Sequence, residues 1–102
     1  MDFKNKVALV TGGARDIGRA VSIHLAARGA SVAVNYFDNA ADAELTVNAI
    51  KASGGQAVAI QADVSRAADV ERLVAETRKA FGEKIDVLVN VAGGLVGRKK
   101  ME

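Results

Sequence analysis

The stretch VALVTGGARDIGRA, residues 7–20, decides the fold. It opens with four consecutive apolar residues, continues through Thr11 and two adjacent glycines, and then passes into a helical pattern. An apolar run without polar alternation is typical of a strand buried on both faces, as in a parallel sheet covered by helices. The stretch therefore predicts a strand, a flexible glycine turn at the carboxyl end of that strand, and a helix.

Three further short apolar runs follow at residues 32–34, 57–60 and 87–89. The segments between them have helical spacing, and each ends at glycine, as helices commonly do. Because crossovers between parallel strands are right-handed, this alternation predicts an α/β fold with a doubly wound parallel sheet. The expected strand order is 3-2-1-4, the first half of a Rossmann fold, in one domain over residues 1–102.

The helical segments carry apolar stripes that we expect to face the sheet. We predict N-caps at Asn39 and Ser65, and we expect His24 to be a partly buried packing residue with no catalytic role. The stripes are Ile17, Val21 and Leu25; Ala43, Val47 and Ile50; and Val70, Leu73, Val74, Thr77 and Phe81.

Composition narrows the class of protein. Of the 102 residues, 50% are hydrophobic and only 4% aromatic, so the core must consist of Val, Ala, Ile and Leu. With 14 basic and 12 acidic residues, the net charge of +2 is too balanced to favour nucleic acid or an anionic membrane as a partner. The chain has no cysteine, and its first apolar run of four residues is too short for a signal peptide or a membrane span. We expect a soluble, cytoplasmic protein without a metal site.

The glycine turn is suited to binding a phosphate group. Gly12 and Gly13 allow the backbone to approach a ligand closely, and Gly18 allows the helix to pack tightly on the strand. The free N–H groups at the start of a helix favour an anion. The alternative is a tight strand-to-helix turn without a ligand.

In three motifs the chain resembles the short-chain dehydrogenases/reductases of the classical type. Thr11, Gly12 and Gly18 match the first loop TGxxxGxG, Asp63-Val64 follows the third strand, and NVAG at 90–93 is similar to NNAG. The extended type, with TGxxGxxG, fits the loop too, but NVAG favours the classical type. Within the family, FKNKVALVTGGARDIGRAV and FGEKIDVLVNVAG are most similar to 3-oxoacyl-[acyl carrier protein] reductases.

The resemblance implies a site for a nicotinamide dinucleotide. It implies that Asp63 bonds the adenine amino group, unless Asp63 caps the following helix beside Ser65. It also implies that Asn90 and Ala92 run along the cofactor ribose, although Asn90 could equally be tied to Thr11. The cofactor-binding residues implied are Gly12, Gly13, Ala14, Arg15, Asp16, Ile17, Gly18, Asn35, Tyr36, Phe37, Asp63, Val64, Asn90, Ala92 and Gly93.

Two residues depart from the family pattern. Asp16 replaces the middle glycine, so its carboxylate either repels a diphosphate or caps the helix and points away while Arg15 offsets its charge. The second interpretation is favoured. Val91 replaces an asparagine, so that only a main-chain contact would survive there.

The end of the second strand favours NADP over NAD. Sites for NAD usually place Asp or Glu there, whereas this chain has Asn35 and Tyr36, with Asp38 beyond them. Arg15 is available for the 2′-phosphate, so we expect NADP, with NAD possible if Asp38 turns inward.

The proton-transfer residues of the family, a Tyr and Lys spaced YxxxK with a Ser upstream, are missing. The one tyrosine, Tyr36, is followed four residues later by Ala40. The chain is therefore expected to be the cofactor-binding portion of a longer reductase acting on a small carbonyl or alcohol substrate, inactive alone and homo-oligomeric, a tetramer or dimer by family. The alternatives are a noncatalytic nucleotide-binding module and a purely structural domain.

The segment alone is expected to be marginally stable, oligomeric or prone to aggregation. Two helices would cover one face of the sheet and one helix the other. This arrangement predicts that Val and Ala of the central strands are partly exposed to solvent, and that the fourth strand is an unpaired edge strand.

Overall fold

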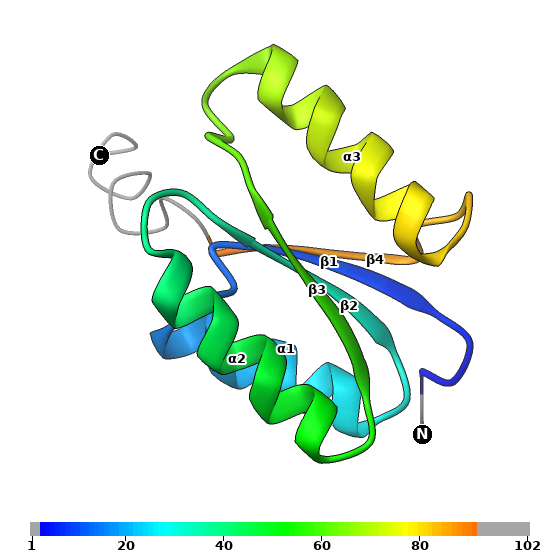
Figure 1. The fold of residues 1–102 in the computed structure, drawn as a ribbon. Coiled ribbons are helices and arrows are strands. Elements are labelled where there is room, and N and C mark those ends of the chain that lie inside the picture. Colours follow the sequence, from blue (N-terminus) through cyan, green and yellow to red (C-terminus); the bar gives the residue numbers. More distant parts are fainter. Residues whose placement is uncertain (1–2, 92–102) are drawn as a thin grey trace, which may run out of the picture.

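The computed structural model describes residues 3–91, which form one sheet and three helices (Figure 1). In chain order the elements are β1 (Val7–Thr11), α1 (Asp16–Ala27), β2 (Ser31–Tyr36), α2 (Ala40–Ala52), β3 (Gln56–Gln61), α3 (Ala67–Phe81) and β4 (Val87–Asn90). Within these residues, no helix is long and apolar enough to cross a membrane.

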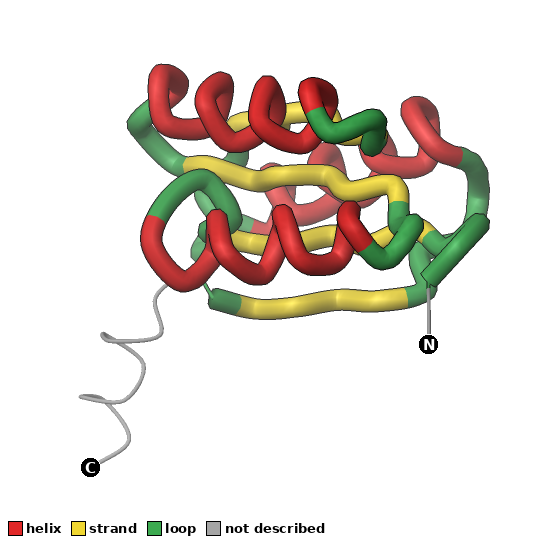
Figure 2. Tube along the Cα trace, turned by 90° about the horizontal axis from the view of Figure 1, so that it is seen from below, coloured by secondary structure: helices red, strands yellow, loops and turns green. Residues whose placement is uncertain are grey.

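The sheet has the order β3-β2-β1-β4, and all of its pairs are parallel. Leu9 of β1 lies opposite Ala33 on one side and Leu88 on the other. Helices α1 and α2 cover one face and α3 covers the other, as Figures 1 and 2 show from two directions. The predicted fold class and strand order are confirmed.

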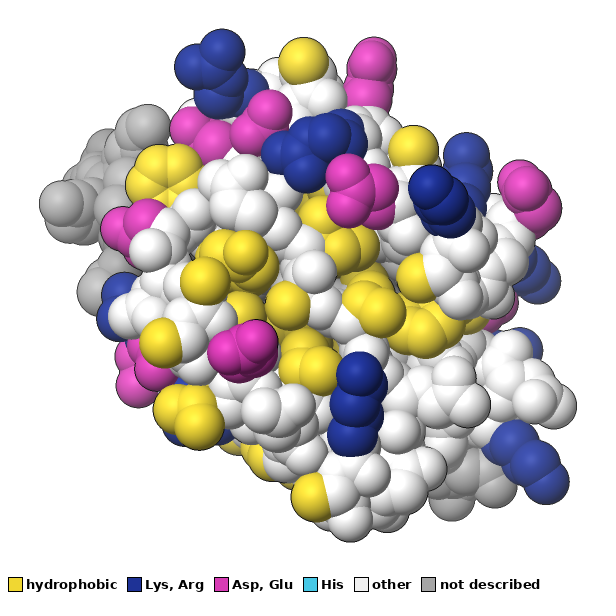
Figure 3. All heavy atoms as spheres, viewed as in Figure 1, with side chains coloured by type: hydrophobic (Ala, Val, Ile, Leu, Met, Phe, Trp, Pro, Cys, Tyr) yellow, Lys and Arg dark blue, Asp and Glu magenta, His cyan; other side chains and the backbone are white. Residues whose placement is uncertain are grey.

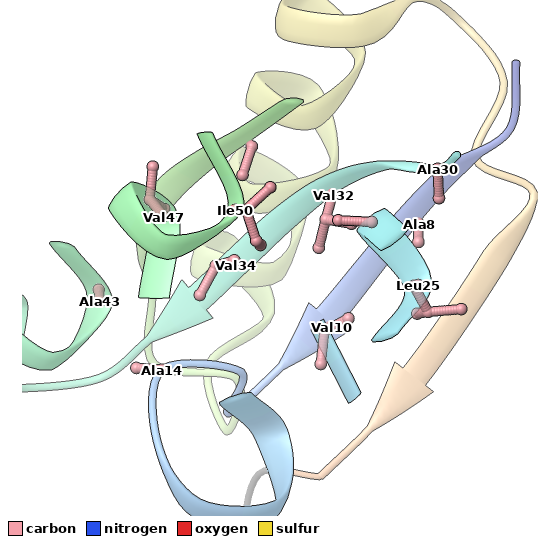
Figure 4. Packing of buried hydrophobic residues seen from close by; sticks show 12 residues of the cluster. Ala8, Val10, Ala14, Leu25, Ala30, Val32, Val34, Ala43, Val47 and Ile50 are labelled. Carbon is pink, nitrogen blue, oxygen red and sulfur yellow. The ribbon is translucent and has the colours of Figure 1, made fainter. Parts of the chain in front are cut away.

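The core lies on both faces of β1 and β2. All five residues of β1 are buried, and Val32 and Val34 of β2 pack with Ile50 of α2 (Figure 4). On the opposite face, Leu9 and Leu73 belong to a smaller cluster under α3. The prediction that Val and Ala of the central strands are partly exposed to solvent is therefore wrong, because the three helices suffice to cover the two short strands β1 and β2.

One exposed large apolar side chain lies at an edge of the described sheet. Leu88 of β4 is 65% exposed and has a partner strand on one side only. Figure 3 shows apolar side chains in the middle of the face along β3, with charged side chains of both signs over α3. A parallel sheet of this size is thus well covered at its centre and poorly covered at its margins.

The stripes predicted for α2 and most of α3 are confirmed, whereas two residues of α1 differ from expectation. Ala43, Val47 and Ile50 are buried, whereas Val70 of the α3 stripe is 37% exposed and the prediction for it is wrong. Ile17 is 70% exposed, because α1 begins only at Asp16 and its first turn projects beyond the carboxyl end of the sheet.

The expectation that His24 is partly buried is also wrong. It is exposed and lies 3.5 Å from the guanidinium of Arg28, one helical turn away. Its position among Ala and Leu residues in the sequence concealed that it falls on the outer side of α1.

One of the two predicted N-caps is confirmed. The side chain of Asn39 accepts a hydrogen bond from the Asp42 N–H at 3.0 Å. Ser65 does not cap α3: the N-cap is Arg66, without a side-chain bond, because the Ser65 hydroxyl donates instead to Asp63.

Candidate functional site

The β1–α1 loop lies at the carboxyl end of a central strand, and two glycines determine its shape. Gly12 has a φ of +66°, a conformation that favours glycine. A Cβ on Gly18 would lie 1.9 Å from the carbonyl oxygen of Gly12, so only glycine allows the first turn of α1 to touch the loop. The close approach directs the first N–H groups of the helix toward the crevice beyond the strand ends.

Asn35 holds this loop from the interior. Its side-chain oxygen accepts from the Gly12 N–H at 3.2 Å, and its backbone carbonyl accepts from the Gly13 N–H at 2.9 Å. Its amide nitrogen donates to the carbonyls of Ile60 and Ala62, each at 3.2 Å. Because Asn35 is only 2% exposed and its amide is fully engaged, its side chain orients the loop and does not line the surface.

Helix α2 holds the loop from outside. The hydroxyl of Thr46 donates to the Ala14 carbonyl and accepts from Arg19 Nε at 2.9 Å. Arg19 Nη2 also lies 3.5 Å from Asp42. The sequence carries no local signal for this network, because its members come from two helices separated by a strand.

Arg15 projects from the loop into solvent, with 60% of its side chain exposed. Its Nη1 lies 3.6 Å from Oδ2 of Asp42 in the first turn of α2. The guanidinium thus has an acidic neighbour other than Asp16.

A shallow depression brings the loop and the end of β2 together. Arg15, Phe37 and Asp38 are exposed there, and Phe37 is 59% exposed. Asp38 also borders this depression. Its lining consists of Gly12, Ala14, Arg15, Tyr36, Phe37, Asp38 and Asn39.

Asp16 does not cap α1, contrary to the favoured interpretation. The N-cap is Arg15, which makes no side-chain capping bond, and Asp16 is the first helical residue, with a φ of +55°. This left-handed conformation is the one that glycine adopts without strain, so Asp16 retains the backbone of a glycine position. Its exposed carboxylate makes no ion pair with residues 3–91.

Asp63 organises the turn before α3 without being its N-cap. Its Oδ1 accepts from the Ser65 hydroxyl at 2.6 Å and from the Ser65 N–H at 3.0 Å, and these bonds, with the Arg66 charge, lower the pKa of the Asp63 carboxyl. The Asp63 N–H donates to Asp69 at 2.8 Å. These bonds therefore favour the ionised form of the carboxyl at the carboxyl end of β3.

Asn90 is tied to Thr11, the alternative that the sequence left open. The Thr11 hydroxyl donates to Oδ1 of Asn90 at 2.7 Å, and the Val91 N–H donates to the Thr11 carbonyl at 3.0 Å. The contact of Val91 with Thr11 is thus made by the main chain and does not depend on the Val91 side chain. Ala92 and Gly93 lie outside the described residues.

A second depression opens on the α3 side of the same strand ends. Of the predicted site residues, it contains Val64 and Asn90, whereas the first depression contains five others. The described site residues that line neither depression are Gly13, Asp16, Ile17, Gly18, Asn35 and Asp63. The lining of the second depression consists of Leu9, Thr11, Val64, Val70, Leu73, Val74, Leu88 and Asn90. A further hollow, between the carboxyl ends of α1 and α2, contains none of the predicted residues.

The described part of the chain has no cluster of side chains that could be the ligands of a metal ion. Residues 3–91 contain no group of three or more His, Asp or Glu side chains that could hold a metal ion.

Comparison with known proteins agrees with this geometry. The family model for short chain dehydrogenase matches residues 6–102. The chain belongs to the short-chain dehydrogenase family. Its parallel sheet of order β3-β2-β1-β4 is thus the sheet of a short-chain dehydrogenase fold.

Two curated relatives differ in how much of their length the chain spans. It is 51% identical over 92 residues to the short-chain dehydrogenase/reductase homolog YusS of Bacillus subtilis, covering 90% of this chain and 84% of that protein. It is 47% identical over 89 residues to the 3-oxoacyl-[acyl-carrier-protein] reductase FabG of Staphylococcus epidermidis, covering 87% of this chain and 36% of FabG. The chain thus spans most of one relative and about a third of the other.

Among solved structures, the chain is similar to a short chain dehydrogenase from Burkholderia cenocepacia in complex with NADP. The TM-score is 0.82 at 43% sequence identity, over 88% of this chain and 36% of that one.

Proposed function

We propose that this chain binds NADP and is the cofactor-binding portion of an oxidoreductase that interconverts carbonyl and hydroxyl groups by hydride transfer. The observation that carries the proposal is the depression between the glycine loop and the end of β2, at the carboxyl edge of the parallel sheet. In open α/β sheets this edge is where ligands bind. NAD is a possible second cofactor.

The residues present fit the cofactor. Two features of the site suit a diphosphate. The absence of a Cβ at Gly12 and Gly18, and the lack of a side-chain cap at the start of α1, both leave backbone N–H groups accessible to an anion. Arg15 would meet the 2′-phosphate, and Tyr36 stands where an NAD site carries a carboxylate. When bound, the reduced nicotinamide supplies the hydride.

The remaining proposed contacts come from four further segments. Phe37 borders the adenosine region, and Asp63 and Val64 follow β3. Asn90 ends β4, and Ala92 and Gly93 come after it in the sequence. The residues of the loop and the first turn of α1 are Gly13, Ala14, Asp16 and Ile17. Asn35 acts by holding the loop.

A small carbonyl or alcohol is the proposed substrate, and a 3-oxoacyl thioester on acyl carrier protein is the more specific candidate. The FabG relative supports this candidate. The 102 residues contain no Tyr-x-x-x-Lys, so the proposal assigns to them cofactor binding and no proton transfer. A cytoplasmic homo-oligomer, a dimer or tetramer, is proposed from the family.

Titration with NADPH and NADH, followed by nicotinamide fluorescence, tests the proposal. We expect saturable binding, tighter for NADPH. Replacing Arg15 by Gln should weaken NADPH about tenfold and leave NADH nearly unchanged, because one charge-assisted bond to the 2′-phosphate is lost. Lys51→Gln, which removes the same charge at the far end of α2, is the control. Absence of binding for both dinucleotides would refute the proposal.

A noncatalytic nucleotide-binding module is the second candidate. It is favoured by the 84% of the YusS homolog that the chain spans, against 36% of FabG. The intact mass of the native protein separates the two: a polypeptide that continues to a Tyr-x-x-x-Lys supports the reductase, and one of 102 residues supports the module.

A further inference from the structure

Asp42 lies between two arginines at the junction of the glycine loop and α2. Its Oδ2 is 3.6 Å from Nη1 of Arg15, and its Oδ1 is 3.5 Å from Nη2 of Arg19. Its own N–H is bonded to the Asn39 cap, so the first turn of α2 fixes where the carboxylate lies.

The two arginines are held very differently. Arg19 is anchored by Nε bonds to Thr46 at 2.9 Å and to the Ala14 carbonyl at 3.3 Å. Among residues 3–91, Arg15 has one ion pair, with Asp42, and 60% of its side chain is exposed. Only Arg15 borders the depression, so it is the cation that can turn toward a ligand there.

Charges of both signs lie around the depression. Arg15 and Asp38 lie in its wall, and Asp42 and Arg19 lie just behind Arg15. A phosphate on the ribose therefore meets one mobile cation that already has a carboxylate partner.

We propose that Asp42 sets the cofactor specificity of this site by competing with the 2′-phosphate for Arg15. This inference rests on the proposed NADP function. Asp42 is a positioning residue: it contacts no cofactor and acts through the guanidinium, lowering the preference for NADPH over NADH.

The weakness of the ion pair determines the direction of the effect. A single exposed contact at 3.6 Å orients Arg15 poorly, so little positioning is lost when it is removed. Removing the carboxylate does, however, eliminate both a competitor and a like charge close to the bound phosphate. Neutralising Asp42 should therefore increase the preference for NADPH.

The test is a double-mutant cycle on the 102-residue chain, with dissociation constants for NADPH and NADH measured by nicotinamide fluorescence. Asp42→Asn should raise the NADPH preference about three- to tenfold. Glu44→Gln removes the same charge from an exposed position on the same helix and should change the preference less than about twofold. In an Arg15→Gln background, Asp42→Asn should raise the preference less than it does with Arg15 present, because only the direct repulsion of the phosphate remains to be removed.

An unchanged or lower preference in Asp42→Asn, or an equal increase without Arg15, would overturn the inference while the NADP function stands. A wild-type chain that binds neither dinucleotide would overturn both. Asp42→Ser, which keeps a polar residue in the first turn of α2, repeats the measurement if circular dichroism shows that Asp42→Asn is unfolded.

Discussion

Asn35 accepts a hydrogen bond from the Gly12 N–H at 3.2 Å across 23 positions of sequence, and this bond joins the glycine loop to the middle of the sheet. The same side chain donates to the carbonyls that end β3. One buried amide thus fixes the relative positions of β1, β2 and β3 at the candidate site.

Replacing Asn35 by Ala should destabilise the fold by about 2–4 kcal/mol, because a buried N–H and two buried carbonyls lose their partner. Urea unfolding measures the change. Asn35→Asp should be at least as harmful, since an anion would face the carbonyls of Ile60 and Ala62. Asn48→Ala, at an exposed position of α2, is the control. A cost below about 1 kcal/mol for Asn35→Ala would contradict this role.

Gly18→Ala should destabilise the chain by about 2 kcal/mol or more, since its Cβ would overlap the Gly12 carbonyl oxygen at 1.9 Å. The sign of the change in unfolding free energy is informative, because helix propensity alone favours Ala over Gly by about 1 kcal/mol. Thermal or urea unfolding distinguishes the two outcomes. The exposed neighbour Ile17, changed to Ala, should alter stability by less than about 0.5 kcal/mol.

At position 16, Gly should be more stable than Ala by about 1 kcal/mol, because a φ of +55° strains a side chain with a Cβ. Comparing Asp16→Gly with Asp16→Ala by urea unfolding measures this difference. At Ala20, in the same helix, the order should be reversed, with Gly less stable than Ala by about 0.5–1 kcal/mol. If Ala were preferred at both positions, the left-handed conformation of residue 16 would be wrong.

Ser65→Ala should raise the pKa of the Asp63 carboxyl toward its ordinary value, because the largest cause of its lowering is the Ser65 hydroxyl bond. Carbon-detected NMR titration of the carboxyl group follows the change. The folded pKa is lowered, so the associated stability is present above the unfolded pKa and is lost as the pH falls through the folded value. Ser65→Ala should therefore have a smaller acid limb of stability, and the loss should be complete at a higher pH than in the unchanged chain. Ser53→Ala, at the end of α2, should leave the Asp63 titration unchanged.

We expect the 102-residue chain to self-associate through the margin of its sheet, where Leu88 of β4 is 65% exposed. Leu88→Lys should shift the chain toward monomer in sedimentation velocity. Leu45→Lys, at a residue 59% exposed on α2, should not. A wild-type chain that stays monomeric on concentration and unfolds in one concentration-independent transition would contradict this expectation.

The strands, the helices and the strand order were predictable because their signals are local. Unbroken apolar runs such as 7–10 identified buried strands, and the glycines after each helix marked the helix ends. The chirality of parallel crossovers then fixed the topology. The cap at Asn39 was likewise predictable, since its partner is three residues away.

What could not be predicted depends on pairing between distant residues. Serine is a residue type that is common at N-caps, but the hydroxyl of Ser65 donates its hydrogen bond to Asp63. Asp16 likewise looked like a cap, whereas the backbone of its glycine position determined its geometry. The link from Asp42 to Arg15 joins α2 to the β1–α1 loop, and nothing in either segment alone indicates it.

The loop's anchors also determine when it can acquire its shape during synthesis. Thr46 bonds Ala14 across 32 positions, and Asn35 bonds Ala62 across 27. A nascent polypeptide on the ribosome has made its glycine turn long before it has made those partners. Competence to hold a ligand should therefore arise abruptly, only once the chain has emerged past Ala62.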